Sequence, residues 1–273
     1  MITERLTTLA AVKEWLGIPA DQTQSDTGLV RVINAASQFI IGYLNRDGFS
    51  PRSYTENFRG TGKASQLLRN WPVLSVSSVD VGSSTFSAST FNGAQPGSGW
   101  VLSDPRMSNQ SVELFGSSFW YRMPARIVYE AGYRNAEAVT VTAADSQPVT
   151  TVPWVPQQGQ WVAGISVKEG DLVYTQVTSA ADIPTHSYYI DDWGTYTFSV
   201  DDVDAELVVT YGFVPWDVSF AVTEIIGEWY RRKEHIGVLS KTLGGQETVT
   251  FSNADISNVA ASALNQYRNV VPM

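Results

Sequence analysis

The sequence predicts an α+β protein: a small helical bundle built from both chain ends, with a β-rich middle region and an inserted antiparallel, sandwich-like β module. Three observations predict this fold class. Apolar residues recur at helical spacing only near the two ends of the 273-residue chain. The middle consists of short apolar runs between turn-forming residues. Each terminal helical segment carries an apolar stripe that nothing local covers, so we expect the two ends to pack together.

Two helices are predicted in the N-terminal segment. The first spans residues 8–16, with Thr7 or Thr8 as its N-cap and Gly17 as its stop. The second spans residues 27–44 and is the strongest helix of this half of the chain. Its apolar face comprises Leu29, Ile33, Ala36, Ile40 and Leu44.

The pattern changes at residue 54 to that of antiparallel strands. Residues 54–135 contain the runs PVLSVSSVDV, GWVLS, QSVELFG and RIVYEAGY, separated by turn signals. Residues 136–213 continue in the same style with AVTVTA, GDLVYTQV, HSYYI and GTYTFSV. We interpret residues 136–213 as a separate inserted module, because their charge and composition set them apart.

Two further helices are predicted at the C-terminal end. The first follows Pro215, with Asp217 as its N-cap and an apolar face from Val218 to Tyr230. A Gly-rich loop and a strand-like TVTF lead to a final helix over residues 255–267. The expected domains are a discontinuous helical body (1–53 and 214–273), a β-rich region (54–135) and the inserted acidic module (136–213).

The net charge of −9 is confined to one stretch of the chain. Residues 136–204 hold ten acidic residues and one base, Lys168, whereas the rest of the chain is neutral. Phosphate backbones repel a segment of this sign, and the remainder has no basic stripe. We therefore expect no tight binding of nucleic acid.

The composition removes most of the usual tools of catalysis. The chain has no Cys and only two histidines, His186 and His235. Disulfides, thiolate zinc sites and multi-histidine metal centres are excluded. We expect a protein that is not an enzyme and that binds no metal and no cofactor. The opening MITERLTT lacks the apolar stretch of a secretory signal, and no apolar run approaches membrane length. The simplest expectation is a protein made in the cytoplasm with no membrane partner.

Several weak motifs have a simpler structural interpretation. Arg59-Gly-Thr-Gly-Lys63 lacks two defining residues of a phosphate-binding loop, so a turn is favoured. The carboxylates at 201–206, with Asp191 and Asp192 nearby, lack the spacing of a calcium loop, and a solvated turn is favoured. Paired carboxylates for glycoside hydrolysis and a Ser-His-Asp triad have no motif in support. Three tryptophans of the module either form an outward sugar-binding face or, as we favour, pack between strands: Trp154, Trp161 and Trp193.

The order of these features resembles the head-to-tail connector, or adaptor, proteins of long-tailed bacteriophages. The matching phrases are LTTLAAVKEWLGI, GLVRVINAASQFIIGYLNR, WPVLSVSSVDV, RIVYEAGY and PWDVSFAVTEIIGEWYRRKEHIG. They cover both ends and part of the middle, and their order is more specific than any one of them. Residues 136–204 depart from the pattern of many relatives.

The resemblance implies a non-enzymatic virion protein at the head-tail junction, assembled in the host cytoplasm. It implies a ring, expected to hold twelve copies, beneath the portal protein. The ring extends the DNA channel without specific DNA binding and docks the next neck or tail-completion protein. The alternative is a tail-tip or baseplate module that recognises glycan through its acidic, aromatic-rich domain.

The candidate contacts with the portal or a neighbouring subunit lie at the C-terminal end. The basic residues that close the helix at 217–236 either touch a partner or form a solvated helix end. An apolar strip followed by an unpatterned tail is typical of a segment that docks on assembly. The candidates are Arg231, Arg232, Ile256, Val259, Leu264, Tyr267, Arg268, Val270 and Val271.

Overall fold

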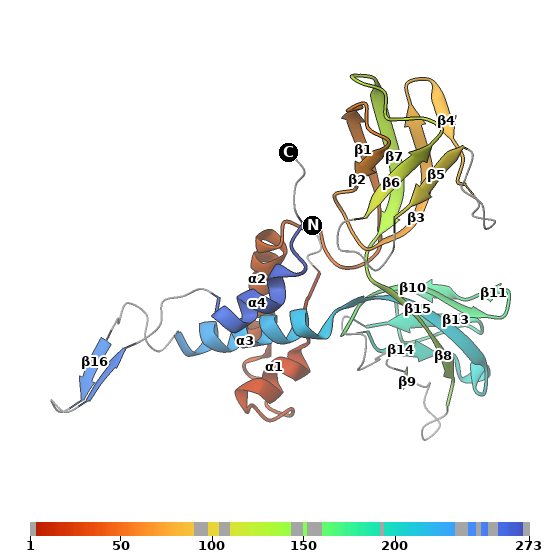
Figure 1. The fold of residues 1–273 in the computed structure, drawn as a ribbon. Helices are drawn as coiled ribbons and strands as arrows, with labels where there is room; N and C mark the ends of the chain where they lie inside the picture. The colour runs from red at the N-terminus through yellow and green to blue at the C-terminus, as the bar shows by residue number, and fades with distance from the viewer. Residues whose placement is uncertain are drawn as a thin grey trace.

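The computed structural model describes residues 4–89, 98–103, 110–142, 150–151, 160–191, 194–232, 240–243, 247–250 and 256–269. A helical body lies at the centre, two β sandwiches extend from one side, and a hairpin projects from the other (Figure 1). The body contains helices α1 (Leu9–Leu16), α2 (Asp26–Tyr43), α3 (Trp216–Arg232) and α4 (Asn258–Asn265). The predicted α+β class, with helices from both chain ends, is confirmed.

One hydrophobic core unites the helices of the two chain ends. Leu29, Ile33 and Ile40 of α2 are fully buried against Val218, Val222 and Ile226 of α3 and against residues of α1 and α4. The predicted apolar faces of the two long helices are therefore the faces that pack. The members of this core with no exposed surface are Leu6, Val12, Ile33, Ala36, Ile40, Leu44, Phe49, Val214, Val218, Val222, Ile226 and Leu264.

The helix ends follow local capping rules, with one correction. The Thr8 side chain accepts a hydrogen bond from the Ala11 amide, and Gly17 ends α1 in the left-handed conformation at φ 69°. The prediction of Asp217 as an N-cap is wrong. Helix α3 begins at Trp216, and the first carbonyl bonded within it is that of Pro215, so Asp217 lies in the first turn.

The first sandwich packs a four-stranded sheet on a three-stranded one. The order is β1-β7-β3-β4 in one sheet and β2-β6-β5 in the other. Alternate residues of β7, such as Ile127 and Tyr129, point into the shared core, which is why RIVYEA folds as a strand. The strands are β1 (Arg52–Arg59), β2 (Ser65–Leu67), β3 (Val73–Val81), β4 (Ser84–Phe86), β5 (Gly99–Leu102), β6 (Ser111–Phe115) and β7 (Pro124–Ala131).

The second sandwich is built from two four-stranded sheets, β11-β10-β15-β8 and β12-β13-β14-β9. Its core is rich in tyrosine, with Tyr188, Tyr196 and Tyr211 all buried. Strand pairing is antiparallel except between β12 and β13, which are parallel. The strands are β8 (Arg134–Thr140), β9 (Thr150–Thr151), β10 (Gln160–Glu169), β11 (Leu172–Val173), β12 (Thr175–Val177), β13 (Ser187–Ile190), β14 (Tyr196–Phe198) and β15 (Glu206–Val214).

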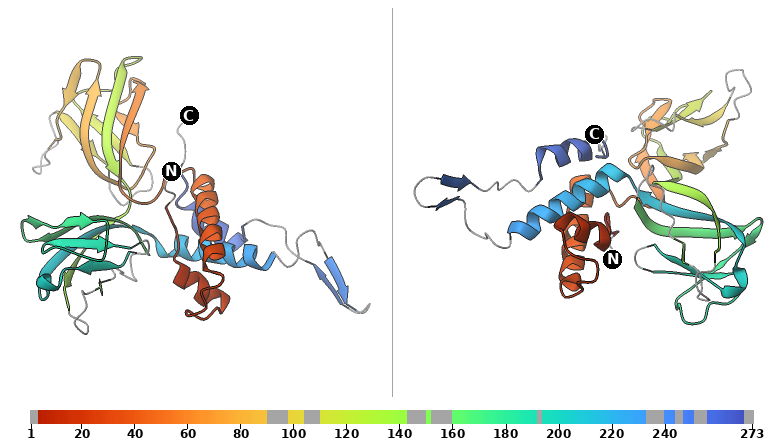
Figure 2. Two further views of the ribbon diagram at one scale, coloured as in Figure 1. Left: turned by 180° about the vertical axis from the view of Figure 1, so that it is seen from behind. Right: turned by 90° about the horizontal axis from the view of Figure 1, so that it is seen from below.

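A two-stranded hairpin stands between α3 and α4 in the chain. It pairs β16 (Ser240–Leu243) with β17 (Glu247–Thr250). The sequence predicted only the second of these strands. Figure 1 and both views of Figure 2 show the hairpin away from the helices and the sandwiches.

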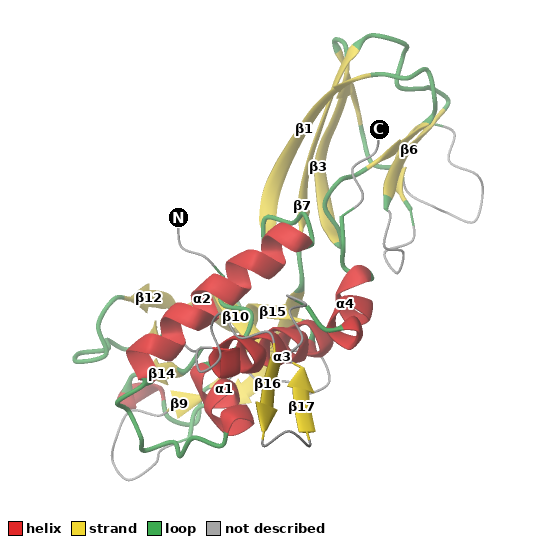
Figure 3. Cartoon of the chain, turned by 90° about the vertical axis from the view of Figure 1, so that its left-hand side faces the viewer, coloured by secondary structure: helices red, strands yellow, loops and turns green. Residues whose placement is uncertain are grey.

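A dense junction joins the helical body to both sandwiches, and Figure 3 shows the first sandwich rising from the end of α2. The Arg46 guanidinium lies 4.1 Å from the Trp71 ring centroid and donates to the carbonyls of Trp71 and Tyr267. The Tyr133 and Phe213 rings meet edge to face at 5.6 Å. These contacts fix both sandwiches to the helical body.

Candidate subunit interface

Two pairs of aromatic rings bridge the helices at the surface of the helical body. Trp15 of α1 meets Phe220 of α3 edge to face, with 5.3 Å between ring centroids. Phe39 of α2 lies 5.6 Å from Trp229 of α3. Trp15 and Phe220 are 44% and 52% exposed, and Phe39 is 37% exposed. Large exposed rings of this kind are typical of surfaces that bind another protein.

The two aromatic pairs lie on opposite sides of α3. Gly227, seven positions after Phe220, is on the same helical face, and its missing side chain leaves room for the Trp15 indole. A Cβ at Gly227 would lie 2.7 Å from the indole nitrogen of Trp15. Trp229 follows two positions later, about half a turn round the helix. The body therefore presents one aromatic pair to each side.

Phe220 was not predicted from the sequence as a surface residue. It lies outside the apolar stripe that builds the core, which runs through Val218, Val222 and Ile226. A large aromatic residue outside that stripe is the sequence signal that could have indicated an exposed ring. Trp15, on α1, is packed against Phe220 and the backbone at Gly227, yet 44% of its side chain remains exposed.

A groove of about 910 Å³ opens between α1 and the second sandwich. Its walls include Ala11 and Ile18 from the first helical segment, Thr195 from the sandwich and Trp216 at the start of α3. Lys13, also in its lining, is paired with Asp26 at 2.6 Å. The exposed lining of the groove is mainly apolar.

Helix α4 completes its own bundle with one face and leaves the other open. Leu264 is fully buried in the core, so its assignment to a partner contact is corrected. Ile256 and Tyr267 also pack against that core. Val259 is 72% exposed and borders an open groove of about 620 Å³ along α4. Val259, one of the candidate contacts, therefore lies on the outer face of the helix.

Asp217 and Tyr267 connect α4 to the start of α3. The Tyr267 hydroxyl donates to both carboxylate oxygens of Asp217, at 2.8 and 3.0 Å, and the Gln266 amide donates to one of them. Burial and the adjacent carboxylate both raise the pKa of Tyr267. Asp217 therefore binds the last helix instead of capping its own.

The remaining candidate residues are placed as follows. Arg231 is exposed near the end of α3, and Arg232 is the last residue of that helix. Arg268 is exposed, with its guanidinium 5.7 Å from the Tyr43 ring centroid. Val270, Val271, Trp154 and Trp193 lie outside the described residues.

Trp161 does not form an outward binding face. Its ring packs against the core of the second sandwich and covers Gly194, where a Cβ would lie 2.3 Å from the indole. Its indole nitrogen is 3.4 Å from the Tyr196 hydroxyl. Trp161 therefore packs within its own sandwich, and it offers no outward surface to the glycan alternative.

Three described acidic residues of the second sandwich stabilise turns. Asp202 is buried and accepts a hydrogen bond from the His186 amide at 3.0 Å. Asp201 accepts from the Thr185 hydroxyl, and Asp191 accepts from the Thr195 amide at 2.8 Å. In the described part of the chain, no group of three or more Asp, Glu and His residues is arranged to hold a metal ion. No helix there is long and apolar enough to cross a membrane.

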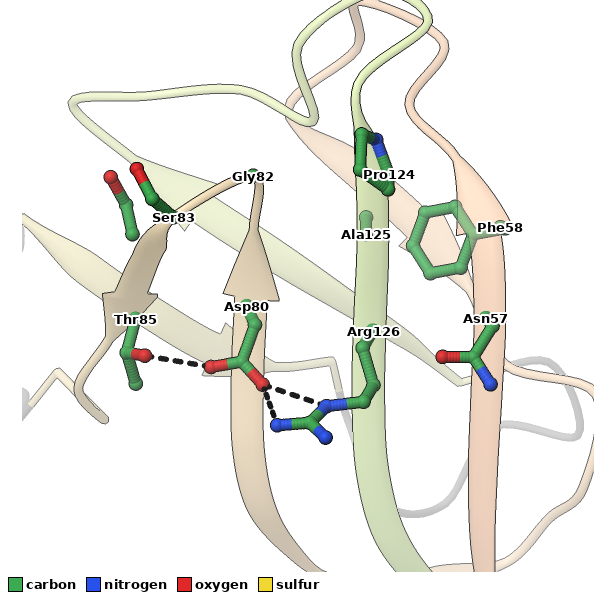
Figure 4. Close-up of a pocket in the computed structure, with 10 residues that line it drawn as sticks. Asn57, Phe58, Asp80, Gly82, Ser83, Thr85, Pro124, Ala125 and Arg126 are labelled. Atoms are coloured by element: carbon green, nitrogen blue, oxygen red, sulfur yellow. Dashed lines mark hydrogen bonds and ion pairs between the residues drawn. The ribbon is translucent and has the colours of Figure 1, made fainter.

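A small pocket of about 360 Å³ lies at the edge of the first sandwich (Figure 4). Asp80 accepts hydrogen bonds from Thr85 at 2.8 Å and from the Arg126 guanidinium at 2.8 and 3.0 Å. The hydrogen bonds from Thr85 and Arg126 lower the pKa of Asp80. Thr85 and Arg126 occupy both carboxylate oxygens of Asp80. The ion pair therefore holds the strands around the pocket together, and Asp80 is not free to bind a ligand.

The turn at 59–63 is confirmed as structural. The amide of Gly60 donates to the Met123 carbonyl at 2.8 Å, and that of Gly62 donates to the Phe119 carbonyl at 2.7 Å. A phosphate-binding loop needs such amides free to face a ligand. Here they hold a neighbouring loop instead.

Comparisons with known proteins returned a family match over part of the chain and a match to a solved structure. Residues 5–139, slightly less than half of the chain, match the family described as head completion protein. The range runs from α1 into β8, and it confirms the resemblance to phage head-tail connectors over this part of the chain. A chain of the solved neck of an empty GTA particle, computed with C6 symmetry, is 14% identical to this chain. That match covers 98% of this chain and 92% of the other, with a TM-score of 0.39. No curated protein sequence matches significantly.

Proposed function

We propose, from the match of residues 5–139 to the head completion protein family, that this chain is a structural protein of a bacteriophage particle at the head-tail junction. Its activity is assembly and not catalysis. The helical body (1–53 and 214–273) forms the wall of a ring, and the β-rich region (54–135) and the inserted module (136–213) project from that wall. The observation that carries the ring is the pair of aromatic surfaces on opposite sides of α3.

Ring closure requires two different surfaces on each subunit. In a head-to-tail ring, each subunit contacts one neighbour with one surface and the other neighbour with a second surface. The Trp15–Phe220 pair and the Phe39 side supply such a pair of surfaces. We assign the contact between subunits to these two sides, and we propose twelve copies, as the connector resemblance implies.

The outer face of α4 is the proposed contact with the portal protein. Val259 and the groove beside it are open, and Arg231 and Arg268 are exposed. The next neck or tail-completion protein would bind the opposite rim of the ring. DNA passes through the channel without specific contact, because the charge outside residues 136–204 is balanced.

Two surface variants test ring closure. Phe220→Glu blocks one side of the subunit and Phe39→Glu blocks the other. Each is produced alone in cells that assemble particles from a genome lacking this chain. We expect neither to form a ring, so imaging of the particles shows no neck density for the chain.

Mixing the two purified variants makes the test specific. Each variant retains the surface that the other lacks, so the mixture is expected to form dimers that grow no further, whereas each variant alone stays monomeric. Mass photometry measures this directly. Thr178→Glu, at an exposed position of the second sandwich, serves as the control and should assemble as the wild type does. Normal rings from both phenylalanine variants would refute the assigned surfaces.

A further inference from the structure

The far end of the first sandwich displays exposed aromatic and basic side chains. We define the aromatic tip as residues 59–64 and 116–123. Trp120 is 40% exposed, Tyr121 is 70% exposed and Met123 is 42% exposed. Arg59, Lys63 and Arg122 are also exposed, and neither segment contains an acidic residue. In a chain of net charge −9, this tip is a local concentration of positive charge.

The strand register places the aromatic tip away from the helical body. Arg52 pairs with Ala131 beside the junction, and Arg59 pairs with Pro124 at the opposite end of the two strands. In Figure 4 Pro124 and Gly82 lie at this end, below the loop that leads to the tip. The tip is therefore available to another molecule.

The aromatic tip is held rigidly. The Gly60 amide donates to the Met123 carbonyl, and the Arg122 amide donates to the Gly60 carbonyl, both at 2.8 Å. A Cβ at Gly60 would lie 2.2 Å from the Trp120 carbonyl oxygen, so only glycine permits this approach. Phe119, fully buried, anchors the loop in the sandwich core. A surface ordered in advance loses little conformational entropy when it binds.

The residue types of the tip favour a protein partner. Trp, Tyr, Met and Arg are enriched at the centres of protein interfaces. The Arg122 guanidinium lies 5.4 Å from the Tyr121 ring centroid, so charge and apolar surface are presented together. The complementary surface must combine apolar side chains with carboxylates.

The far end of the second sandwich has that combination. Glu206 pairs with Thr140 at this end, whereas Gly212 pairs with Arg134 beside the junction. Leu172, Val173 and Val200 are exposed by 45, 56 and 58%. We define the acidic end as these residues together with their exposed acidic neighbours, which are Asp171, Asp201, Asp204 and Glu206.

We infer that the aromatic tip of one subunit docks on the acidic end of the neighbouring copy. This inference rests on the proposed ring and adds a second contact to it, outside the helical wall. Both surfaces face away from the junction of their own chain, and the two sandwiches diverge from that junction (Figure 1). The tip therefore does not contact the acidic end of its own chain. It contacts that of another copy, in the same head-to-tail arrangement as the wall contacts.

Crosslinking between single-cysteine variants tests the contact, because the chain has no cysteine of its own. Two differently tagged variants, Tyr121→Cys and Leu172→Cys, are produced together in cells that assemble particles. A short bismaleimide is then added to the purified particles. We expect a crosslinked dimer that carries both tags. Asp21→Cys, exposed on the helical body, replaces Leu172→Cys as the control and should give no such dimer.

Charge reversal tests whether the attraction is electrostatic. The tip variant combines Arg59→Glu with Arg122→Glu, and the end variant combines Asp171→Lys with Glu206→Lys. Each is introduced into both cysteine variants and should reduce the mixed dimer about tenfold, which corresponds to about 1.4 kcal/mol. All four reversals together should restore it, whereas a merely misfolded tip would not be restored.

The outcomes separate this inference from the proposed function. If the chain is present at the neck but Tyr121→Cys crosslinks only to a cysteine of a different virion protein, or to nothing, the tip contact is refuted and the ring stands. If imaging shows no ring at the neck, the proposed function fails and the tip contact fails with it.

Discussion

Gly132 is the residue at which the two sandwiches leave the junction. Its φ is +143°, and a Cβ there would lie 2.6 Å from the Pro51 backbone. Residues that carry a side chain rarely adopt this conformation, and a Cβ at this position would collide with the backbone of Ser50 and Pro51. The close approach of these two segments sets the direction in which both sandwiches extend.

We predict that Gly132→Ala lowers the free energy of unfolding by about 2 kcal/mol or more, because strain and steric conflict add. The urea midpoint measures the change. Gly28→Ala is the matched control: it lies in α2 with nothing within 4 Å, and it should be neutral or stabilising by about 0.5–1 kcal/mol. Equal midpoints for the two variants would contradict the tight junction.

Tyr133 gives the junction a dependence on alkaline pH. Burial raises the pKa of its hydroxyl to about 12, although the nearby Arg46 guanidinium opposes the shift. The folded pKa exceeds the unfolded value of about 10. The stability contribution is therefore complete below pH 10 and is lost as the pH rises towards 12.

We predict that Tyr133→Phe reduces the loss of stability between pH 10 and 12, since phenylalanine keeps the ring and removes the proton. Urea midpoints at intervals of half a pH unit measure the slope. Burial also raises the pKa of other tyrosines, including that of Tyr211 to about 12. The variant should therefore reduce the dependence of stability on pH without abolishing it. An unchanged slope would show that Tyr133 ionises normally in the folded protein.

At the scale of elements, α4 illustrates how one helix serves two surfaces. Its Ser257 cap accepts from the Ala260 amide, and Ala260 and Leu264 then fall on the buried face. Val259 is displaced from that face by one position and points outward. A single short helix thus contributes to the core and remains available for a partner.

We predict different effects when two side chains of α4 are truncated to alanine. Leu264→Ala should lower the free energy of unfolding by about 2–5 kcal/mol, because it leaves a cavity in the core. Val259→Ala should leave the urea midpoint nearly unchanged and weaken incorporation of the chain into particles. The midpoint and quantitative blotting of particles measure the two effects. A large stability loss at Val259 would mean that α4 packs in a different register.

The sequence predicts elements best where periodicity and capping agree. The face of α2 and the Thr8 and Gly17 ends of α1 are examples, because both signals are local. The start of α3 was misplaced by two residues because Asp217 suits an N-cap, whereas its actual partner, Tyr267, lies 50 positions away. The exposure of Phe220 and the burial of Leu264 depend on helix packing, which a local pattern does not encode. The aromatic tip was recognised only as a turn for the same reason.

At the scale of the whole molecule, Arg46 holds three bodies in one arrangement. It follows α2, stacks on Trp71 of the first sandwich segment and donates to the carbonyl of Tyr267 after α4. Tyr133, where the second sandwich begins, lies 5.9 Å from the same guanidinium. Burial lowers the pKa of Arg46, and the carbonyls and rings around it compensate for lost water.

We predict that Arg46→Ala loosens the sandwiches from the helical body and lowers the free energy of unfolding by about 2–4 kcal/mol, since two carbonyls lose their donor. Small-angle scattering should show a larger radius of gyration. Arg268→Ala removes an exposed guanidinium that lies over Tyr43, and it serves as the control with an unchanged scattering curve. A rigid Arg46→Ala protein would show that the aromatic contacts alone set the arrangement.

The second sandwich begins and ends at neighbouring points. The Phe213 amide donates to the Tyr133 carbonyl at 3.2 Å, so the chain returns to the place it left. A unit attached in this way can be exchanged for a foreign domain whose own termini lie close together, without moving the helices. The position is a natural grafting point, from which a cargo such as an enzyme or an antigen would decorate each particle once per subunit.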